Sequence, residues 1–252
     1  MVALAVCDSG ILVMHLLAWI NCLTSELLAG KIYILFASQF ECSFMEYLYD
    51  AAITVEPAFI CTLTFERLVV IYSPIKGKTI TTARTAKIMI VFIVIFSFLL
   101  SSFLPYYLTY SHELGCHHID EFSRIVDYLR GVIVFMYIPI LLVFVFNLLI
   151  IVSLKRAGKS VATNTKSTAN SAKITQTILA ISFTFAICLL PMASMIAITS
   201  VRPDWQETLA IPLELSKMIY TINNAINFYI YACTGKEIRE AVVVLFTKTK
   251  DV

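Results

Sequence analysis

The sequence has little of the charge and glycine on which soluble folds rely. Only 14% of its 252 residues are charged and only seven are glycine, whereas 59% are hydrophobic and the mean hydropathy is +0.84. This composition excludes an ordinary soluble domain and indicates an integral membrane protein. Few glycines leave little room for hairpin turns, and several apolar runs approach the length that a membrane-spanning helix needs. We therefore predict an all-α helical bundle in the membrane.

Other absences narrow the function. The sequence holds no metal-binding histidine pair and no phosphate-binding loop, so we predict neither an enzyme nor a metal centre. The net charge of +2 is distributed by loop and forms no single patch, which argues against a nucleic-acid partner. No signal peptide or soluble tail precedes the first apolar run.

We predict one transmembrane domain over residues 1–252, with six helices that cross the lipid bilayer. The expected helices cover about 1–23, 39–72, 87–107, 126–154, 173–200 and 208–234. The polar segments at 73–87, 109–130 and 155–173 are predicted loops. A further amphipathic helix over about 236–246 is expected to lie along the membrane surface, because its apolar residues share one face.

The basic residues predict the orientation. Fourteen of the nineteen Lys and Arg residues fall at Arg67, in the segments 73–87 and 155–173, and in the C-terminal tail. The positive-inside rule makes that side cytoplasmic, so we expect a multi-pass plasma-membrane protein with a cytoplasmic C-terminus. Cys42 and Cys116 then lie on the oxidising side, where they either form a disulfide or remain two unpaired thiols.

Charged residues stand where a membrane makes charge costly. Asp8 lies inside the first predicted span, and Glu56 precedes Pro57 near the middle of the second. At the end of that helix, Arg67 either reaches the lipid headgroups as a plain anchor or is held by the adjacent Glu66. Asp8 and Glu56 could also serve a cation or proton transporter, although the sequence lacks the repeated halves and interrupted helices of such proteins.

In their order and spacing, these residues resemble the rhodopsin-like (class A) G protein-coupled receptors. Leu4, Ala5 and Asp8 match the family's Leu-Ala-x-x-Asp, and Glu66 with Arg67 matches its Asp/Glu-Arg. Further matches are Cys42 and Cys116 at the extracellular disulfide, Pro139 and Pro191 at the helix-bending prolines, and Asn227 with Tyr231 at Asn-Pro-x-x-Tyr. The family's first helix has no counterpart, so we expect a truncated sequence; the alternative is a six-helix remnant that does not signal.

The resemblance implies a receptor that binds an extracellular ligand and activates a heterotrimeric G protein. The residues it assigns to coupling and switching are Glu66, Arg67, Asn147, Pro191, Asn227 and Tyr231. Several positions depart from the family pattern. Leu189 replaces the Trp beneath the ligand, Phe228 replaces a proline, and Asn147 replaces an inner-end Tyr.

The resemblance also implies that Asp8, Glu56, Asn223 and Asn227 meet in an ion and water pocket. A sodium ion is the one bound group that we expect. Glu56 is unusual, because the family commonly has a small hydroxyl residue there. Two unpaired charged carboxylates are costly in this medium, so they should share a cation or a proton. Alternatively, Glu56 turns toward a backbone carbonyl that Pro57 leaves free.

The ligand class is narrowed by two replacements. Tyr49 stands where amine receptors have an Asp, and Thr221 stands where light receptors have the retinal Lys. The stretch 223–231 and the acidic segment around Cys116 resemble invertebrate neuropeptide receptors of the FMRFamide type, so a peptide ligand is expected. The residues proposed to meet it, or otherwise to remain solvated, are Glu46, Tyr49, Asp50, Asp120, Glu121, Leu189 and Glu214.

Overall fold

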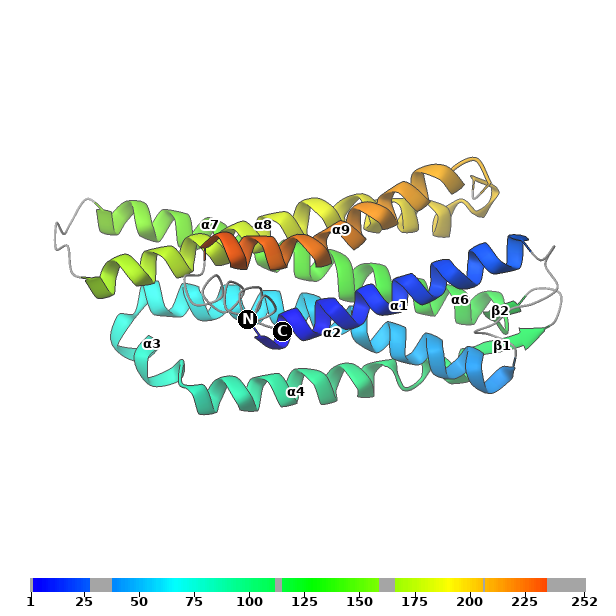
Figure 1. Ribbon diagram of the computed structural model, residues 1–252, viewed down its shortest axis with the longest axis horizontal. Helices are drawn as coiled ribbons and strands as arrows, with labels where there is room; N and C mark the ends of the chain where they lie inside the picture. Colours follow the sequence, from blue (N-terminus) through cyan, green and yellow to red (C-terminus); the bar gives the residue numbers. More distant parts are fainter. Residues whose placement is uncertain (1, 28–37, 112–114, 159–165, 206, 235–252) are drawn as a thin grey trace, which may run out of the picture.

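The computed structural model describes residues 2–27, 38–111, 115–158, 166–205 and 207–234. Long helices lie side by side along one axis, and a β-hairpin and a short helix, α3 (Pro74–Ile80), lie at opposite ends of the bundle (Figure 1). The predicted all-α bundle is confirmed. The surface helix expected over 236–246 lies outside the described residues.

Six long helices form the bundle. They are α1 (Val2–Leu27), α2 (Gln39–Tyr72), α4 (Ala83–Ser101), α7 (Ile138–Gly158), α8 (Lys166–Val201) and α9 (Ala210–Thr234). Within the described residues, three stretches are long and apolar enough to cross a membrane by themselves: 83–107, 121–156 and 174–201. The helices α1, α2 and α9 instead carry buried polar residues such as Asp8, Glu56 and Asn223.

The helix α2 lies at the centre of the bundle and contacts α1, α4, α7 and α8. It begins where the Ser38 side chain accepts a hydrogen bond from the Glu41 backbone N–H at 3.2 Å, and it ends before Ser73 and Pro74. Its bounds are those predicted. The apolar side chains Val55, Phe59 and Ile60 pack in the main core with residues of α8, among them Phe185 and Leu189.

Two predicted loops are wrong because they contain helix. Between α2 and α4 lies α3 (Pro74–Ile80), with proline in its first turn, where a missing N–H is tolerated. The helix α4 starts at Ala83 rather than 87, since the Thr82 side chain caps it by accepting from the Thr85 N–H at 3.1 Å. The helix α8 likewise starts at Lys166 rather than 173. Polar residues can extend a helix beyond the bilayer, so polarity alone did not mark a loop.

The predicted loop over 109–130 is also wrong. The short helix α5 (Leu104–Tyr107) leads into the strands β1 (Leu108–Ser111) and β2 (Gly115–His118), which pair antiparallel with Tyr110 opposite Cys116. The helix α6 (Glu121–Tyr128), the π-helix η1 (Leu129–Tyr137) and α7 then follow without a break, and a 3-10 turn η2 (Pro203–Trp205) precedes α9. The wider π turns end just before Pro139, which cannot donate a backbone hydrogen bond.

The hairpin is joined to the start of α2 by covalent and polar contacts. A disulfide links Cys42 to Cys116, which confirms that pairing, and the Cys42 side chain is fully buried beside Leu104 and Leu108. The Gln39 amide donates to the Leu108 carbonyl at 3.0 Å and accepts from the Tyr110 N–H at 2.8 Å. The hairpin is thereby held over this end of the bundle.

Removing the disulfide should destabilise this end. We predict that Cys116→Ser lowers the free energy of unfolding by about 2–5 kcal/mol and reduces delivery to the cell surface. Surface labelling and mass spectrometry of non-reduced peptides check this. The matched control is Cys188→Ser, which removes a free thiol. Equal behaviour of the two variants would contradict the structural role.

Candidate functional site

The most deeply buried charged side chain is Glu56 of α2, which is 0% exposed. Its Oε2 accepts from the Tyr220 hydroxyl at 2.7 Å, and its Oε1 accepts from the Asn223 amide at 2.6 Å. When the Asn224 amide is oriented to satisfy its own hydrogen bonds, its nitrogen lies 3.1 and 3.3 Å from the same two oxygens. Glu56 is therefore held by donors of α9, and it does not turn to a carbonyl freed by Pro57.

A second carboxylate lies beside this group. Asp8 of α1 is 3% exposed, and its Oδ2 accepts from the Asn227 amide at 3.1 Å. In the part of the chain that the structure describes, the Oδ1 atoms of Asp8, Asn223 and Asn227 are buried without a hydrogen-bond partner. Buried oxygen acceptors of this kind fit a water molecule or a hard cation. The four residues predicted for an ion pocket thus lie along the contacts of α1, α2 and α9.

Acidic, histidine and cysteine side chains alone do not form a site for such a cation in the part of the chain that the structure describes. Among the described residues, no group of three or more His, Cys, Asp or Glu side chains is arranged for a metal ion. A cation here would have to use the amide oxygens of Asn223 and Asn227 together with the Asp8 carboxylate. That donor set suits a weakly bound sodium ion better than a transition metal.

Contacts from Tyr49 through His15 and Tyr220 form an aromatic path that ends at Glu56. The path begins in the hairpin half, which is the half of the bundle nearer the hairpin. The Nδ1 of His15 bonds the Ile11 carbonyl at 3.1 Å and is therefore the donor nitrogen, so the Tyr49 hydroxyl donates to Nε2 at 3.1 Å. The His15 ring meets the Tyr220 ring edge-on at 6.0 Å between centroids, and Tyr220 donates to Glu56. The path therefore crosses from α2 through α1 to α9 and back to α2.

His15 and Tyr220 were not among the residues predicted from the sequence, although their spacing was informative. His15 lies seven residues after Asp8, two helical turns along the same face, and Tyr220 lies three residues before Asn223. Leu189 was predicted to replace a ligand-facing Trp. It is 2% exposed and packs in the apolar core, where it offers no polar group to a ligand.

A largely buried ionic cluster lies near the hairpin, and its basic member was not among the residues predicted from the sequence. The Arg130 guanidinium of η1 donates to both oxygens of Asp50 at 2.8 and 2.9 Å and to Asp127 at 2.6 Å. The side chains of Arg130 and Asp50 are only 13% and 12% exposed. The rings of Phe103 and Phe135 lie 4.6 and 4.8 Å from the guanidinium carbon. Arg130 falls within the predicted helix over about 126–154, but a helix pattern does not show that its side chain faces Asp50, which lies 80 residues away.

The cluster carries more negative than positive charge. His118 of β2 lies 3.7 Å from the second oxygen of Asp127. Burial lowers the pKa of His118, although the Asp127 carboxylate raises it, so the imidazole is neutral near pH 7. Two carboxylates and one guanidinium then leave one excess negative charge. Glu46 lies one helical turn before Asp50 and is close enough to both aspartates for their charges to repel.

The other acids predicted to meet a ligand have local partners. Asp120 caps α6 by accepting from the Ser123 backbone N–H at 2.7 Å, and this hydrogen bond lowers the pKa of Asp120. Glu121 and Glu214 each pair with a base three residues farther along the chain, at 3.2 and 2.7 Å. Among the described residues Glu46 forms no ion pair. Of the predicted set, Glu46, Tyr49 and Asp50 are therefore brought together, and Glu214 is close enough for its charge to act on Tyr49.

At the opposite end, the expected pair of Glu66 with Arg67 is not formed. Consecutive helical residues point about 100° apart, and the Arg67 Nε is buried without a hydrogen-bond partner among the described residues. The Asn147 amide oxygen accepts from the Ser182 hydroxyl at 3.0 Å and so links α7 to α8. Pro191 lies inside α8, and Tyr231 lies in α9.

The Arg130 cluster should contribute strongly to stability. We predict that Arg130→Gln destabilises the protein by about 3–5 kcal/mol, because it leaves the buried Asp50 and the partly buried Asp127 without their cation. The double variant with Asp50→Asn should lose less than the sum of the two single changes, with a coupling of roughly 0.5–3 kcal/mol. Unfolding of purified protein in detergent measures both. Lys217→Gln, at an exposed pair, should cost at most about 1 kcal/mol, and a similar loss at the two sites would contradict the role of burial.

A comparison with protein families agrees with four features of the structure. These are the buried Asp8 of α1, the disulfide at the start of α2, Arg67 near its end and Pro191 in α8. The family described as 7 transmembrane receptor (rhodopsin family) matches residues 1–231 of the chain. A comparison with curated proteins finds no match. Members of this family are membrane receptors and not enzymes, so the match over most of the length fixes the class of the protein. The chain belongs to the rhodopsin family of seven-transmembrane receptors.

Proposed function

We propose that the protein is a plasma-membrane receptor that binds an extracellular peptide with a basic group and activates a heterotrimeric G protein. The observation that carries the ligand class is the excess of acid in the hairpin half. There Asp50 and Asp127 share the single cation Arg130, and Glu46 has no cation of its own among the described residues. A guanidinium or ammonium group of a ligand would offset this charge.

The likeness of the 223–231 stretch to FMRFamide-type receptors supports a peptide rather than a small amine. Tyr49 agrees with this choice, since it offers a hydroxyl where amine receptors present a carboxylate. A cation or proton transporter is less well supported, because both oxygens of Glu56 already accept hydrogen bonds from α9.

Within this proposal, the aromatic path carries the ligand's effect inward. A ligand that moves Tyr49 changes its hydrogen bond to His15, and His15 contacts the Tyr220 ring that donates to Glu56. The family has a Trp beneath the ligand where this chain has Leu189, and the aromatic path would serve in place of that Trp. It ends at the contact between α2 and α9, so a shift there can alter the other end of α2, where Arg67 lies.

The G protein is proposed to bind at the end that carries Arg67 and most of the basic residues. An arginine whose Nε lacks a partner among the described residues is available for a new contact when the helices separate. The acidic surface of a partner would be guided there by the positive charge. The C-terminus is cytoplasmic in this arrangement.

The direct test is guanine-nucleotide exchange. Membranes with the receptor are treated with peptides that carry or lack a basic group, and the basic peptides should accelerate exchange. We predict that Arg67→Ala abolishes the response while surface expression is kept. Arg84→Ala, at an exposed basic residue on the same side, should leave the response unchanged. Unaltered exchange in Arg67→Ala would remove this residue from the mechanism.

A sodium ion is proposed to bind Asp8 with the amide oxygens of Asn223 and Asn227. The three buried oxygens without partners support it. The ion would neutralise the Asp8 carboxylate next to Glu56 and so favour the inactive arrangement, in which α1, α2 and α9 stay together.

This site predicts a sodium-dependent basal activity. Basal exchange should fall as sodium rises in the wild type, whereas Asp8→Asn should lose this response. Glu56→Gln keeps one acceptor oxygen for Tyr220 or Asn223, and it should shift the sodium concentration of half-effect. Exchange is measured in sodium against a large organic cation at constant ionic strength. Identical sodium curves for all three proteins would show that the group has no switching role.

A further inference from the structure

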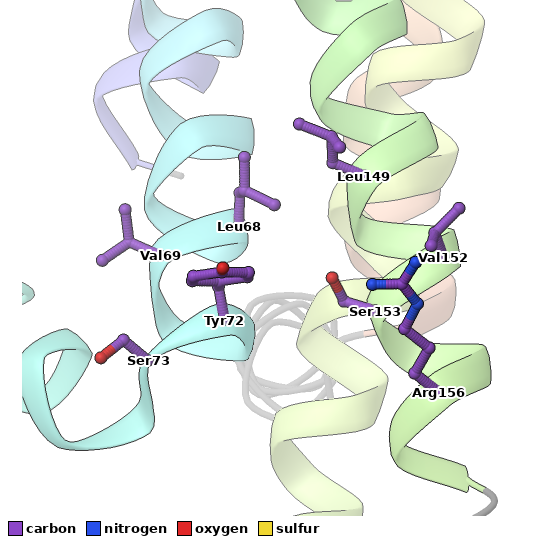
Figure 2. A pocket seen from close by; sticks show the side chains of 8 residues that line it. All are labelled: Leu68, Val69, Tyr72, Ser73, Leu149, Val152, Ser153 and Arg156. Carbon is purple, nitrogen blue, oxygen red and sulfur yellow. The ribbon is translucent and has the colours of Figure 1, made fainter.

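A pocket of about 420 Å³ lies between the ends of α2 and α7, at the end of the bundle away from the hairpin. Its walls come from the end of α2 with its cap and from the last three turns of α7, which face one another in Figure 2. The lining residues are Leu68, Val69, Tyr72, Ser73, Leu149, Val152, Ser153 and Arg156. The proposed function does not use this pocket.

The pocket is apolar over most of its wall and polar at one edge. Leu68 extends from α2 toward α7, and Leu149 stands on the facing helix (Figure 2). At the edge, the Arg156 and Ser153 side chains both line the pocket from α7, three residues apart on that helix (Figure 2). Within the described ranges Arg156 forms no ion pair, so its charge is available to an anion.

The pocket lies at the level where the helices are expected to leave the hydrocarbon of the membrane. The apolar stretch that can cross the bilayer runs over 121–156 and ends at Arg156. Leu149 is 45% exposed and Val152 is 36% exposed on the same helix, so the apolar wall is open to the surroundings. A long basic side chain at such a position places its charge among the headgroups while its stem stays in the hydrocarbon.

We propose that this pocket binds an anionic phospholipid, with one acyl chain between α2 and α7 and the headgroup on Arg156 and Ser153. A guanidinium can hold a phosphate or carboxylate with two parallel hydrogen bonds, and a serine hydroxyl can add a third. The side of the protein with most of the Lys and Arg residues faces the leaflet in which anionic lipids gather. A zwitterionic lipid would fill the same apolar wall without the net charge that Arg156 selects.

The bound lipid would also lie next to the coupling end of the receptor. Leu68 and Val69 directly follow Arg67, and Ser73 caps the same helix. An acyl chain between α2 and α7 therefore contacts the turn that carries Arg67. Binding itself requires no G protein and no peptide, so it can be tested apart from the proposed function.

The test uses the full chain in nanodiscs of phosphatidylcholine. A trace of photoactivatable phosphatidylserine, or of phosphatidylcholine with the same photoactivatable chain, is added, and labelled peptides are mapped by mass spectrometry. We expect labels on 68–73 and 149–156, with about five-fold more from phosphatidylserine. This factor corresponds to the roughly 1 kcal/mol that one basic residue contributes at an anionic surface. Thermal unfolding confirms that each variant is folded.

Two variants separate a built site from general surface charge. Arg156→Gln should reduce the preference to about one-fold, whereas Lys155→Gln, at the exposed neighbour that does not line the pocket, should keep it. The proposal is overturned if the wild type shows no preference, if the two variants lose it equally, or if the labels fall elsewhere. It is also overturned if soluble glycerophosphoserine displaces the label, because the site would then take a free anion and not a lipid.

Discussion

A carboxylate buried at the centre of the bundle constrains this structure more than any other group. Glu56 has no exposed surface, so its oxygens must be satisfied by the protein, and α9 supplies the donors. Hydrogen bonds to a charged group contribute roughly 1.5–3 kcal/mol each, but an unmade one costs at least as much. The relative position of α2 and α9 is therefore fixed by a small polar group as well as by apolar packing. A shift of either helix has to exchange these bonds for others.

The two ends of the bundle differ in how they are held. Near the hairpin, the disulfide, the Gln39 hydrogen bonds and the Arg130 cluster all join α2 to the segments that follow α4. At the other end, Glu66 and Arg67 form no ion pair, and an open pocket separates the ends of α2 and α7. A receptor needs a firm ligand-binding end and a coupling end that can rearrange, and the distribution of strong contacts along α2 fits that division. The polar groups around Glu56 lie between the two ends.

Much of the fold could be predicted from local properties of the sequence. Apolar runs predict helices because the bilayer leaves few other structures, and the bounds of α2 follow from the Ser38 cap and the Ser73-Pro74 end. The errors fell where polar residues were equated with loops. Thr82 begins a helix rather than closing a loop, and Lys166 starts α8 well before its apolar part. The hairpin was missed because its two short strands are stabilised by a disulfide and by α2, and not by their own alternation of residues.

The sequence by itself determined the class of the protein, since composition, the order of Asp8, Cys42, Arg67 and Pro191, and the charge of each segment are properties of the chain. The tertiary structure alone decided which polar groups meet. Glu56 pairs with residues 164 and 167 positions away, and Arg130 with one 80 positions away. Such partners depend on how each helix is rotated about its axis, which packing against the other helices sets. For the same reason, no local pattern could show that Arg156 lies at the edge of a pocket or that His15 connects Tyr49 to Tyr220.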